Sequence, residues 1–84
     1  MALRVRIPPS IVRLPAAELS IERAPPDIGS LLRELDVLHP GLAKLLDSSA
    51  VNAAVNGDVV LHGRDATALA DGDEVEFLLM FAGG

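Results

Sequence analysis

Half of the 84 residues are hydrophobic, and the formal net charge is −5, from 12 acidic and 7 basic side chains. This length indicates one domain with a single aliphatic core, and the lack of cysteine excludes disulfides, thiolate zinc sites and cysteine nucleophiles. The negative charge would repel phosphate backbones, and the two aromatic residues are too few to form a base-stacking platform. We therefore expect no nucleic-acid partner and favour a basic protein surface instead.

The N-terminal segment, MALRVRIPPSIVRLP, is interrupted by Arg4, Arg6 and a proline pair, so it lacks the apolar core of a signal peptide. No apolar run approaches the roughly 20 residues that a membrane-spanning helix needs. We therefore predict a soluble cytoplasmic protein with no membrane partner.

Two short segments near the N-terminus alternate between hydrophobic and polar residues, which is the period of a β-strand. They are residues 3–7, ended by Pro8-Pro9, and residues 18–22. We expect an antiparallel pair, in which the arginines of the first strand lie near the glutamates of the second on the outer face.

The period then changes to that of a helix, with Asp27 as a suitable N-cap after a proline pair. The predicted apolar stripe consists of Ile28, Leu31, Leu32, Leu35 and Leu38. Pro40-Gly41 should end this helix. Residues 42–48 predict a short second helical turn, with one side formed by Leu42, Leu45 and Leu46.

The C-terminal half predicts three more strands. Residues 51–61 suit a hairpin, because Asn56-Gly57 tolerates the positive φ angles of a type I′ turn. Residues 62–68 predict a loop, and the turn Asp71-Gly72-Asp73 precedes a final strand. One face of that strand carries Val75, Phe77, Leu79 and Phe81, and the other carries Glu74, Glu76, Leu78 and Met80.

The element order is therefore β-β-α-(α)-β-β-β, which predicts an α+β fold. One main helix packed across one face of a mixed, four- to five-stranded sheet would bury every apolar stripe. We place the domain at residues 1–81 and a flexible C-terminal tail at residues 82–84.

The sequence lacks the residue patterns that most kinds of catalytic site require. His39 and His62 lack spaced metal-ligand partners, and no serine lies in a G-x-S-x-G context. The acidic residues 71–76 do not have the spacing of a calcium loop, and no glycine-rich nucleotide loop is present. We therefore predict a protein that is not an enzyme and that binds no cofactor or metal.

Two features at the C-terminus remain. Leu78 and Met80 are apolar on a strand face otherwise assigned to solvent, with Ala54 expected beside them, and such a patch favours a protein partner. The chain then ends FAGG, a thin tail that extends about 13 Å and can enter a narrow channel of another protein. Its terminal carboxylate is a poor electrophile, so acyl chemistry requires activation, for example as an adenylate formed by a partner that supplies the ATP site.

The segments DIGSLLRELDVLHPGL, VNGDVV and ALADGDEVEFLLMFAGG resemble the ThiS/MoaD family of prokaryotic sulfur carriers over nearly the whole chain. The resemblance implies the β-grasp, or ubiquitin-like, fold. It also implies that an E1-like enzyme adenylates the C-terminal glycine, that sulfide or a persulfide converts it to a thiocarboxylate, and that the thiocarboxylate donates sulfur to a biosynthetic acceptor. On this resemblance Gly84 carries the chemistry and Gly83 allows access to it. The partner-binding residues would be Leu78, Met80, Phe81 and Ala82.

One departure concerns the lead-in to the glycines, where many family members have proline and this chain has LLMFAGG. The length and the LHPGL segment are closer to the small subunit of molybdopterin synthase, which implies molybdopterin biosynthesis and a MoaE-like acceptor. Carriers for thiamine, cysteine or sulfur-containing natural products stay open. A ubiquitin-like protein modifier is another alternative, although Lys44 as the single lysine argues against self-built chains. A non-catalytic interaction module is the third.

Overall fold

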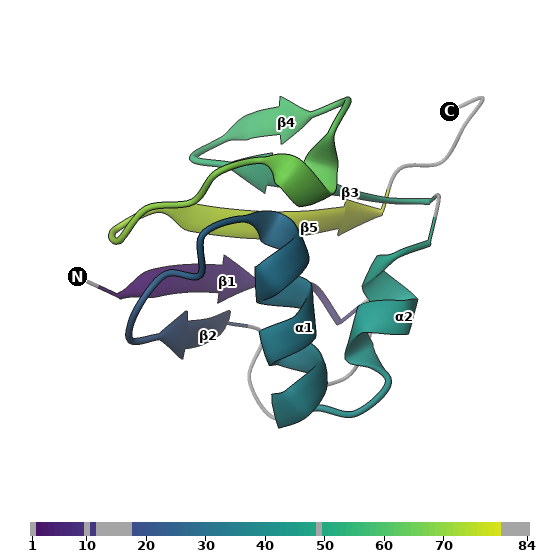
Figure 1. The fold of residues 1–84 in the computed structure, drawn as a ribbon. Helices are drawn as coiled ribbons and strands as arrows, with labels where there is room; N and C mark the ends of the chain where they lie inside the picture. The colour runs from purple at the N-terminus through teal and green to yellow at the C-terminus, as the bar shows by residue number, and fades with distance from the viewer. Residues whose placement is uncertain (1, 10, 12–17, 49, 80–84) are drawn as a thin grey trace.

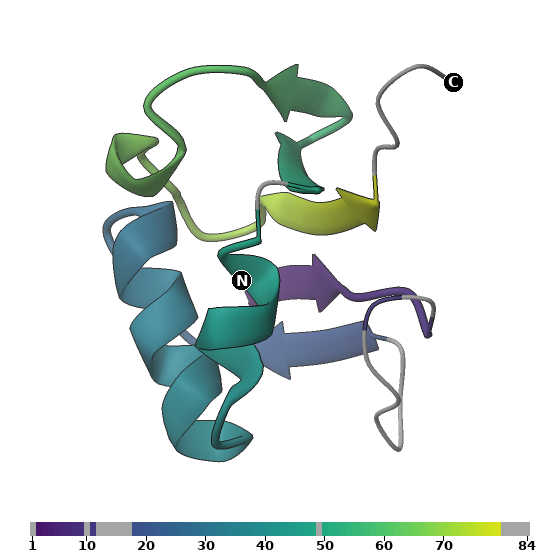
Figure 2. The same cartoon turned by 90° about the vertical axis from the view of Figure 1, so that its right-hand side faces the viewer.

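The computed structural model describes residues 2–9, 11, 18–48 and 50–79, which form a sheet covered on one face by helices (Figure 1). The turned view in Figure 2 shows the two layers, with both helices on the same side of the sheet. The elements are β1 (Leu3–Arg6), β2 (Glu18–Ile21), α1 (Ile28–Leu38), α2 (Leu42–Leu46), β3 (Val51–Val55), β4 (Asp58–Val60), the 3-10 turn η1 (Arg64–Ala66) and β5 (Glu74–Leu79). This arrangement confirms the expected α+β class.

The sheet has five strands in the order β2-β1-β5-β3-β4. β5, the last element, lies at the centre, parallel to β1 and antiparallel to β3. The outer pairs, β1 with β2 and β3 with β4, are antiparallel. The order of elements along the chain is as predicted, and this mixed topology is the ubiquitin-like one that the family resemblance implied. The boundary expected between residues 81 and 82 lies outside the described residues and stays a prediction.

The β1–β2 pair forms as predicted, but only one arginine meets a glutamate of β2. Arg6 Nε lies 3.7 Å from Glu18 Oε2. Arg4 lies opposite Ser20 in the register, and its Nη2 instead contacts Glu74 Oε2 of β5 at 3.0 Å. The sequence pattern of the hairpin alone contains no information on the strand that flanks β1 on its other side.

The predicted N-cap of α1 is confirmed. Asp27 has an extended backbone, and its Oδ1 accepts a hydrogen bond of 2.8 Å from the backbone N–H of Ser30. The N–H of Ile28 donates to the carbonyl of Thr67 at 3.1 Å, which ties the start of the helix to the segment after η1. The pKa of Asp27 is lowered from its ordinary value, because hydrogen bonds from the backbone and the side chain of Ser30 favour the ionised carboxylate.

The prediction that Leu38 and Leu45 are buried is wrong. Leu38, the last residue of α1, is 61% exposed, because it lies at the margin of the helical stripe and Leu42 of α2 takes the next core position. Leu45 is 47% exposed. The buried side of α2 is centred between Leu42 and Leu46, and Leu45 lies at the margin of that side.

The β3–β4 hairpin has the predicted Asn-Gly turn. Asn56 and Gly57 have φ angles of 52° and 88°, as a type I′ turn requires. The Asn56 side chain also binds across to β5, donating to Asp73 Oδ1 and accepting from the N–H of Glu74, both at 3.0 Å. The turn therefore aligns the hairpin with the start of the central strand.

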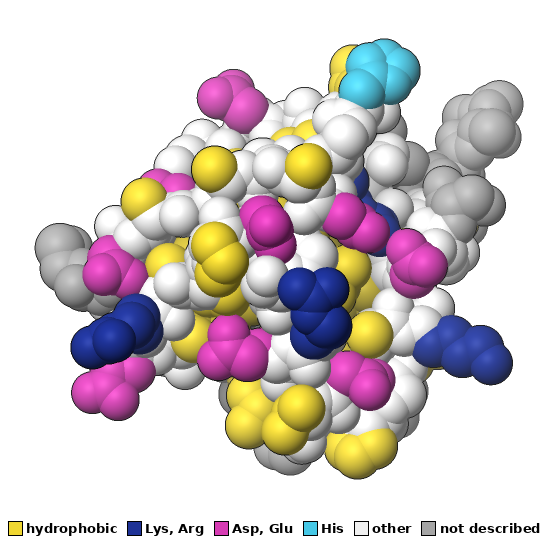
Figure 3. Space-filling view, viewed as in Figure 1, with side chains coloured by type: hydrophobic (Ala, Val, Ile, Leu, Met, Phe, Trp, Pro, Cys, Tyr) yellow, Lys and Arg dark blue, Asp and Glu magenta, His cyan; other side chains and the backbone are white. Residues whose placement is uncertain are grey.

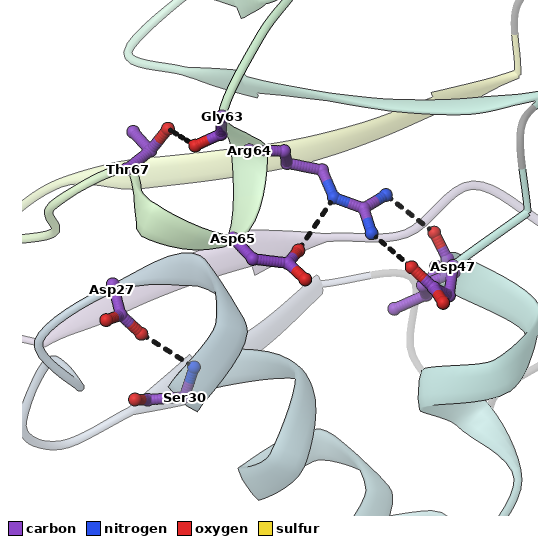
Figure 4. Close-up of polar contacts among 8 residues, drawn as sticks. Asp27, Ser30, Asp47, Gly63, Arg64, Asp65 and Thr67 are labelled. Atoms are coloured by element: carbon purple, nitrogen blue, oxygen red, sulfur yellow. Dashed lines mark hydrogen bonds and ion pairs between the residues drawn. The ribbon is translucent and has the colours of Figure 1, made fainter.

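The segment predicted as a loop contains η1, whose Arg64 joins three groups (Figure 4). Its Nη1 donates to the carbonyl of Leu46 at 3.0 Å, its Nη2 to Asp47 Oδ1 at 2.7 Å and its Nε to Asp65 Oδ1 at 3.2 Å. Only 18% of the Arg64 side chain is exposed. The contact holds the segment after β4 against the end of α2.

The N-cap generates a pH-dependent prediction. Asp27→Ala should lower the unfolding free energy at pH 7, because the N–H of Ser30 loses its acceptor. Since the folded pKa of Asp27 lies below the ordinary value of 3.8, this stabilisation is complete above that pH and is lost as the pH falls through the folded pKa. Thermal unfolding of wild type and variant between pH 7 and pH 2 would measure the difference in stability between them, which should become smaller as the pH falls.

The matched control is Asp27→Asn, which keeps a capping oxygen and removes the titrating group. It should stay near wild-type stability at pH 7 and exceed wild type at the acidic end. Equal stability of Asp27→Ala and wild type at pH 7 would contradict the capping assignment.

Arg64→Ala should lower the unfolding free energy by about 1–2 kcal/mol, because a little-exposed, charge-assisted contact to Leu46 and Asp47 is lost. Arg33→Ala is the control: this exposed arginine of α1 makes one described hydrogen bond, to Ser30 Oγ at 3.0 Å, and its loss should cost less than about 0.5 kcal/mol. Urea unfolding of both variants tests the difference. Equal effects would show that Arg64 does not hold the two segments together.

Candidate functional site

The central strand β5 leads directly toward the C-terminus. Val75 and Phe77 project from it into the core and are fully buried, and Leu79 packs against the same cluster. These positions confirm the predicted inward face. Because β1 and β3 pair with β5 on its two sides, β5 is held by hydrogen bonds along both edges.

The opposite face of the sheet, which we call the open face, is charged at one end. It comprises the residues of each strand that point away from the helices: Arg4, Arg6, Glu18, Ser20, Asn52, Ala54, Val59, Glu74, Glu76 and Leu78. The ion pairs Arg4–Glu74 and Arg6–Glu18 lie over β1 and its neighbours. Because these side chains are 32–57% exposed, the ion pairs contribute little to stability.

The other end of the open face is apolar. Leu78 lies opposite Asn52 and is partly buried. The register places Ala54 between Glu76 and Val59, which confirms that Ala54 shares this face. Its methyl group is buried, because larger side chains flank it on both neighbouring strands. An apolar strip therefore runs from Leu78 at the end of β5 across Ala54 to Val59 on β4.

Leu78 is the one predicted site residue that lies within the described part of the chain. It has the orientation that we expected, on the open face near the end of β5. The other predicted site residues lie outside the described residues and their roles stay predictions: Met80, Phe81, Ala82, Gly83 and Gly84.

Two exposed apolar residues on and just after β4 were not singled out from the sequence. Val59 is 41% exposed and Leu61, just beyond β4, is 74% exposed. The strand period in residues 58–61 already assigns these two residues to one side and Val60 to the other. The sequence pattern does not reveal that β4 is an edge strand, and this position explains their exposure.

Other kinds of site find little support in the described residues. A hollow of about 370 Å³ between α1, α2 and η1 mixes Arg33 and Lys44 with the carboxylates of Asp27, Asp47 and Asp65. Figure 3 shows acidic and basic side chains interspersed on this helical side. Within the described ranges, no three His, Asp or Glu side chains are grouped as metal ligands would be. No helix in the same part of the chain is long and apolar enough to cross a bilayer.

Comparison with known proteins gives a family and several similar solved structures, two of which are described here. The ThiS family model matches residues 5–84. The crystal structure of Mycobacterium tuberculosis CysO, described as an antigen, is similar with a TM-score of 0.78 and 26% identity, over 94% of this chain and 99% of that one. The solution structure of the Haloferax volcanii HVO 2177 protein has a TM-score of 0.68 and 31% identity, over 100% of this chain and 87% of that one. A search of curated proteins gave no match.

The two faces of β5 should respond differently to substitution. Phe77→Ala should lower the unfolding free energy by about 3–5 kcal/mol, because it leaves a cavity in the core. Leu78→Lys should change it by less than about 1 kcal/mol, because the longer side chain can extend over the open face into water. Chemical denaturation measures both, and a Leu78→Lys variant as unstable as Phe77→Ala would place Leu78 in the core.

Proposed function

Because the chain belongs to the ThiS family, we propose that it is a sulfur carrier whose reacting group is the carboxylate of Gly84. The observation that carries the proposal is the family match over residues 5–84, which spans both the domain and the C-terminal glycines. It is supported by the central position of β5, whose residues Glu74–Leu79 are the last described before the proposed tail.

The proposed chemistry takes place in a partner. An E1-like enzyme binds ATP, and a carboxylate oxygen of Gly84 attacks the α-phosphorus, forming an acyl-adenylate and releasing pyrophosphate. The sulfur of a hydrosulfide then attacks the carbonyl carbon and displaces AMP, which leaves a thiocarboxylate. Transfer of that sulfur to an acceptor, with water supplying the returning oxygen, restores the carboxylate for another cycle.

This chain contributes position and recognition. The fully buried Val75 and Phe77 anchor β5, so the domain acts as a rigid holder for the segment that follows. The apolar strip from Leu78 to Val59 offers a docking surface beside the end of β5, and Leu78 is the described residue nearest the tail on it. Gly83 and Ala82 have too little side-chain bulk to obstruct entry into a narrow channel.

For the sulfur acceptor we propose a MoaE-like large subunit of molybdopterin synthase. The support is the chain length and the LHPGL segment, which leads from α1 into α2. Acceptors that make the thiazole of thiamine, cysteine or another sulfur-containing product are the alternatives.

The first test is the mass of the protein after production with a cognate E1-like enzyme and a sulfur source. Replacement of one oxygen by sulfur should add about 16 Da. Deletion of Gly84 should abolish this gain while the circular dichroism spectrum and thermal unfolding stay unchanged. An unmodified mass, with an activating enzyme that demonstrably forms adenylate on another carrier, would refute the proposal.

The acceptor is identified by offering the thiocarboxylated protein to purified acceptors of each class and measuring loss of the added sulfur. Loss of the added sulfur with the MoaE-like subunit and with no other acceptor would support the proposed acceptor. Loss with a different acceptor would show that the proposed acceptor is wrong. A Gly-Gly remnant on lysines of other cellular proteins would instead indicate a protein modifier.

A further inference from the structure

The two edges of the sheet differ in how they are protected. Edge strands with unpaired backbone groups are usually shielded by charge, proline or a covering element. The β2 edge carries exposed Glu18, which pairs with Arg6, and exposed Ser20. The β4 edge has one charged residue, the exposed Asp58 beside the turn, and then carries Val59 and Leu61, with neither lysine nor proline in residues 58–61.

The register shows which backbone groups face outward on β4. Val55 and Asp58 flank the two-residue turn, so they form a hydrogen-bonded pair, and the next pair, Ala54 with Val59, is non-hydrogen-bonded. Val59 therefore directs its N–H and C=O away from β3, toward the free edge. β4 ends at Val60, and the pairing proposed below requires Leu61 to follow the same alternation one residue beyond the strand.

We propose that the β4 edge pairs with the same edge of a second copy of this chain, antiparallel and centred on Val60. In this register Val59 lies opposite Leu61 of the second copy, and Leu61 opposite Val59. Both members of each pair direct their backbone groups outward, so each pair forms the two bonds of an antiparallel ladder. The two exposed apolar side chains then meet on the open face, where each removes the other from water.

Charge complementarity favours a second copy over an unrelated strand. The same register places Asp58 opposite His62 of the second copy, at both ends of the paired segment, and both residues are exposed in the single chain. An imidazole has at least one ring N–H donor in either protonation state, and a carboxylate accepts it. One register therefore pairs apolar with apolar and donor with acceptor at every position around Val60.

The contact is small, so the association is weak, with a dissociation constant on the order of 0.1–1 mM. It uses β4, which is separated from β5 by β3. β5 therefore keeps both its neighbours in the dimer, and the pairing shares only Val59 with the docking surface proposed above.

Sedimentation of the full chain over a concentration series tests the pairing. The average mass should rise toward that of a dimer, and the amide resonances of Val59 and Leu61 should shift with concentration. Leu61→Lys should weaken association about tenfold or more, because each dimer contains two of the altered pairs. The control is Val37→Lys, on the 81% exposed position of α1, which should associate as wild type does.

A charge exchange tests the register itself. Asp58→Lys should weaken association, because it removes the acceptor opposite His62, and adding His62→Asp to the same chain should restore it. Circular dichroism confirms that each variant folds. A wild type that stays monomeric to about 1 mM, or a double variant no better than Asp58→Lys, would overturn the proposal.

Discussion

The structure depends on insertion of the C-terminal strand between two strands formed much earlier in the chain. β5 pairs with β1 on one side and β3 on the other, and its Phe77 is among the largest fully buried side chains. The N–H of Arg4 donates to the carbonyl of Asp73 at 3.0 Å, so the first strand and the last turn meet. These contacts close long loops, and the sheet is complete only when the last element is in place. The core is therefore complete only when β5 has paired with β1 and β3.

The two faces of the sheet differ in composition. The helical side is filled with aliphatic side chains from α1 and α2, whereas the open face is divided between ion pairs and an apolar strip. This division suits the proposed sulfur carrier, because the core can be rigid while the proposed reacting group, the Gly84 carboxylate, follows the last strand in the sequence. The open face is not wholly exposed, since Ala54 lies on it and is buried.

Local patterns predicted the elements well. Asp27 caps α1, Asn56-Gly57 forms the turn and Val75 and Phe77 point inward, because each depends on neighbours within a few residues. The wrong expectations, the burial of Leu38 and Leu45, concern helix ends, where the stripe alone does not say which turn the sheet covers. The ion-pair partner of Arg4 could not be predicted either, since Glu74 is its neighbour only through the parallel pairing of β1 with β5.

By itself, the sequence determined the order of elements, the family resemblance and the Gly-Gly ending on which the proposed chemistry rests, because these are properties of residues close together in the chain. The tertiary structure decided which strands are neighbours, that β4 and β2 are the edges, and that Arg64 joins η1 to the end of α2. The physical reason is that periodicity assigns a side chain to a face, whereas its exposure depends on which distant segment pairs beside it. Val59 and Leu61 are apolar in any fold, and they are exposed here because, among the described residues, no strand lies beyond β4 in the sheet.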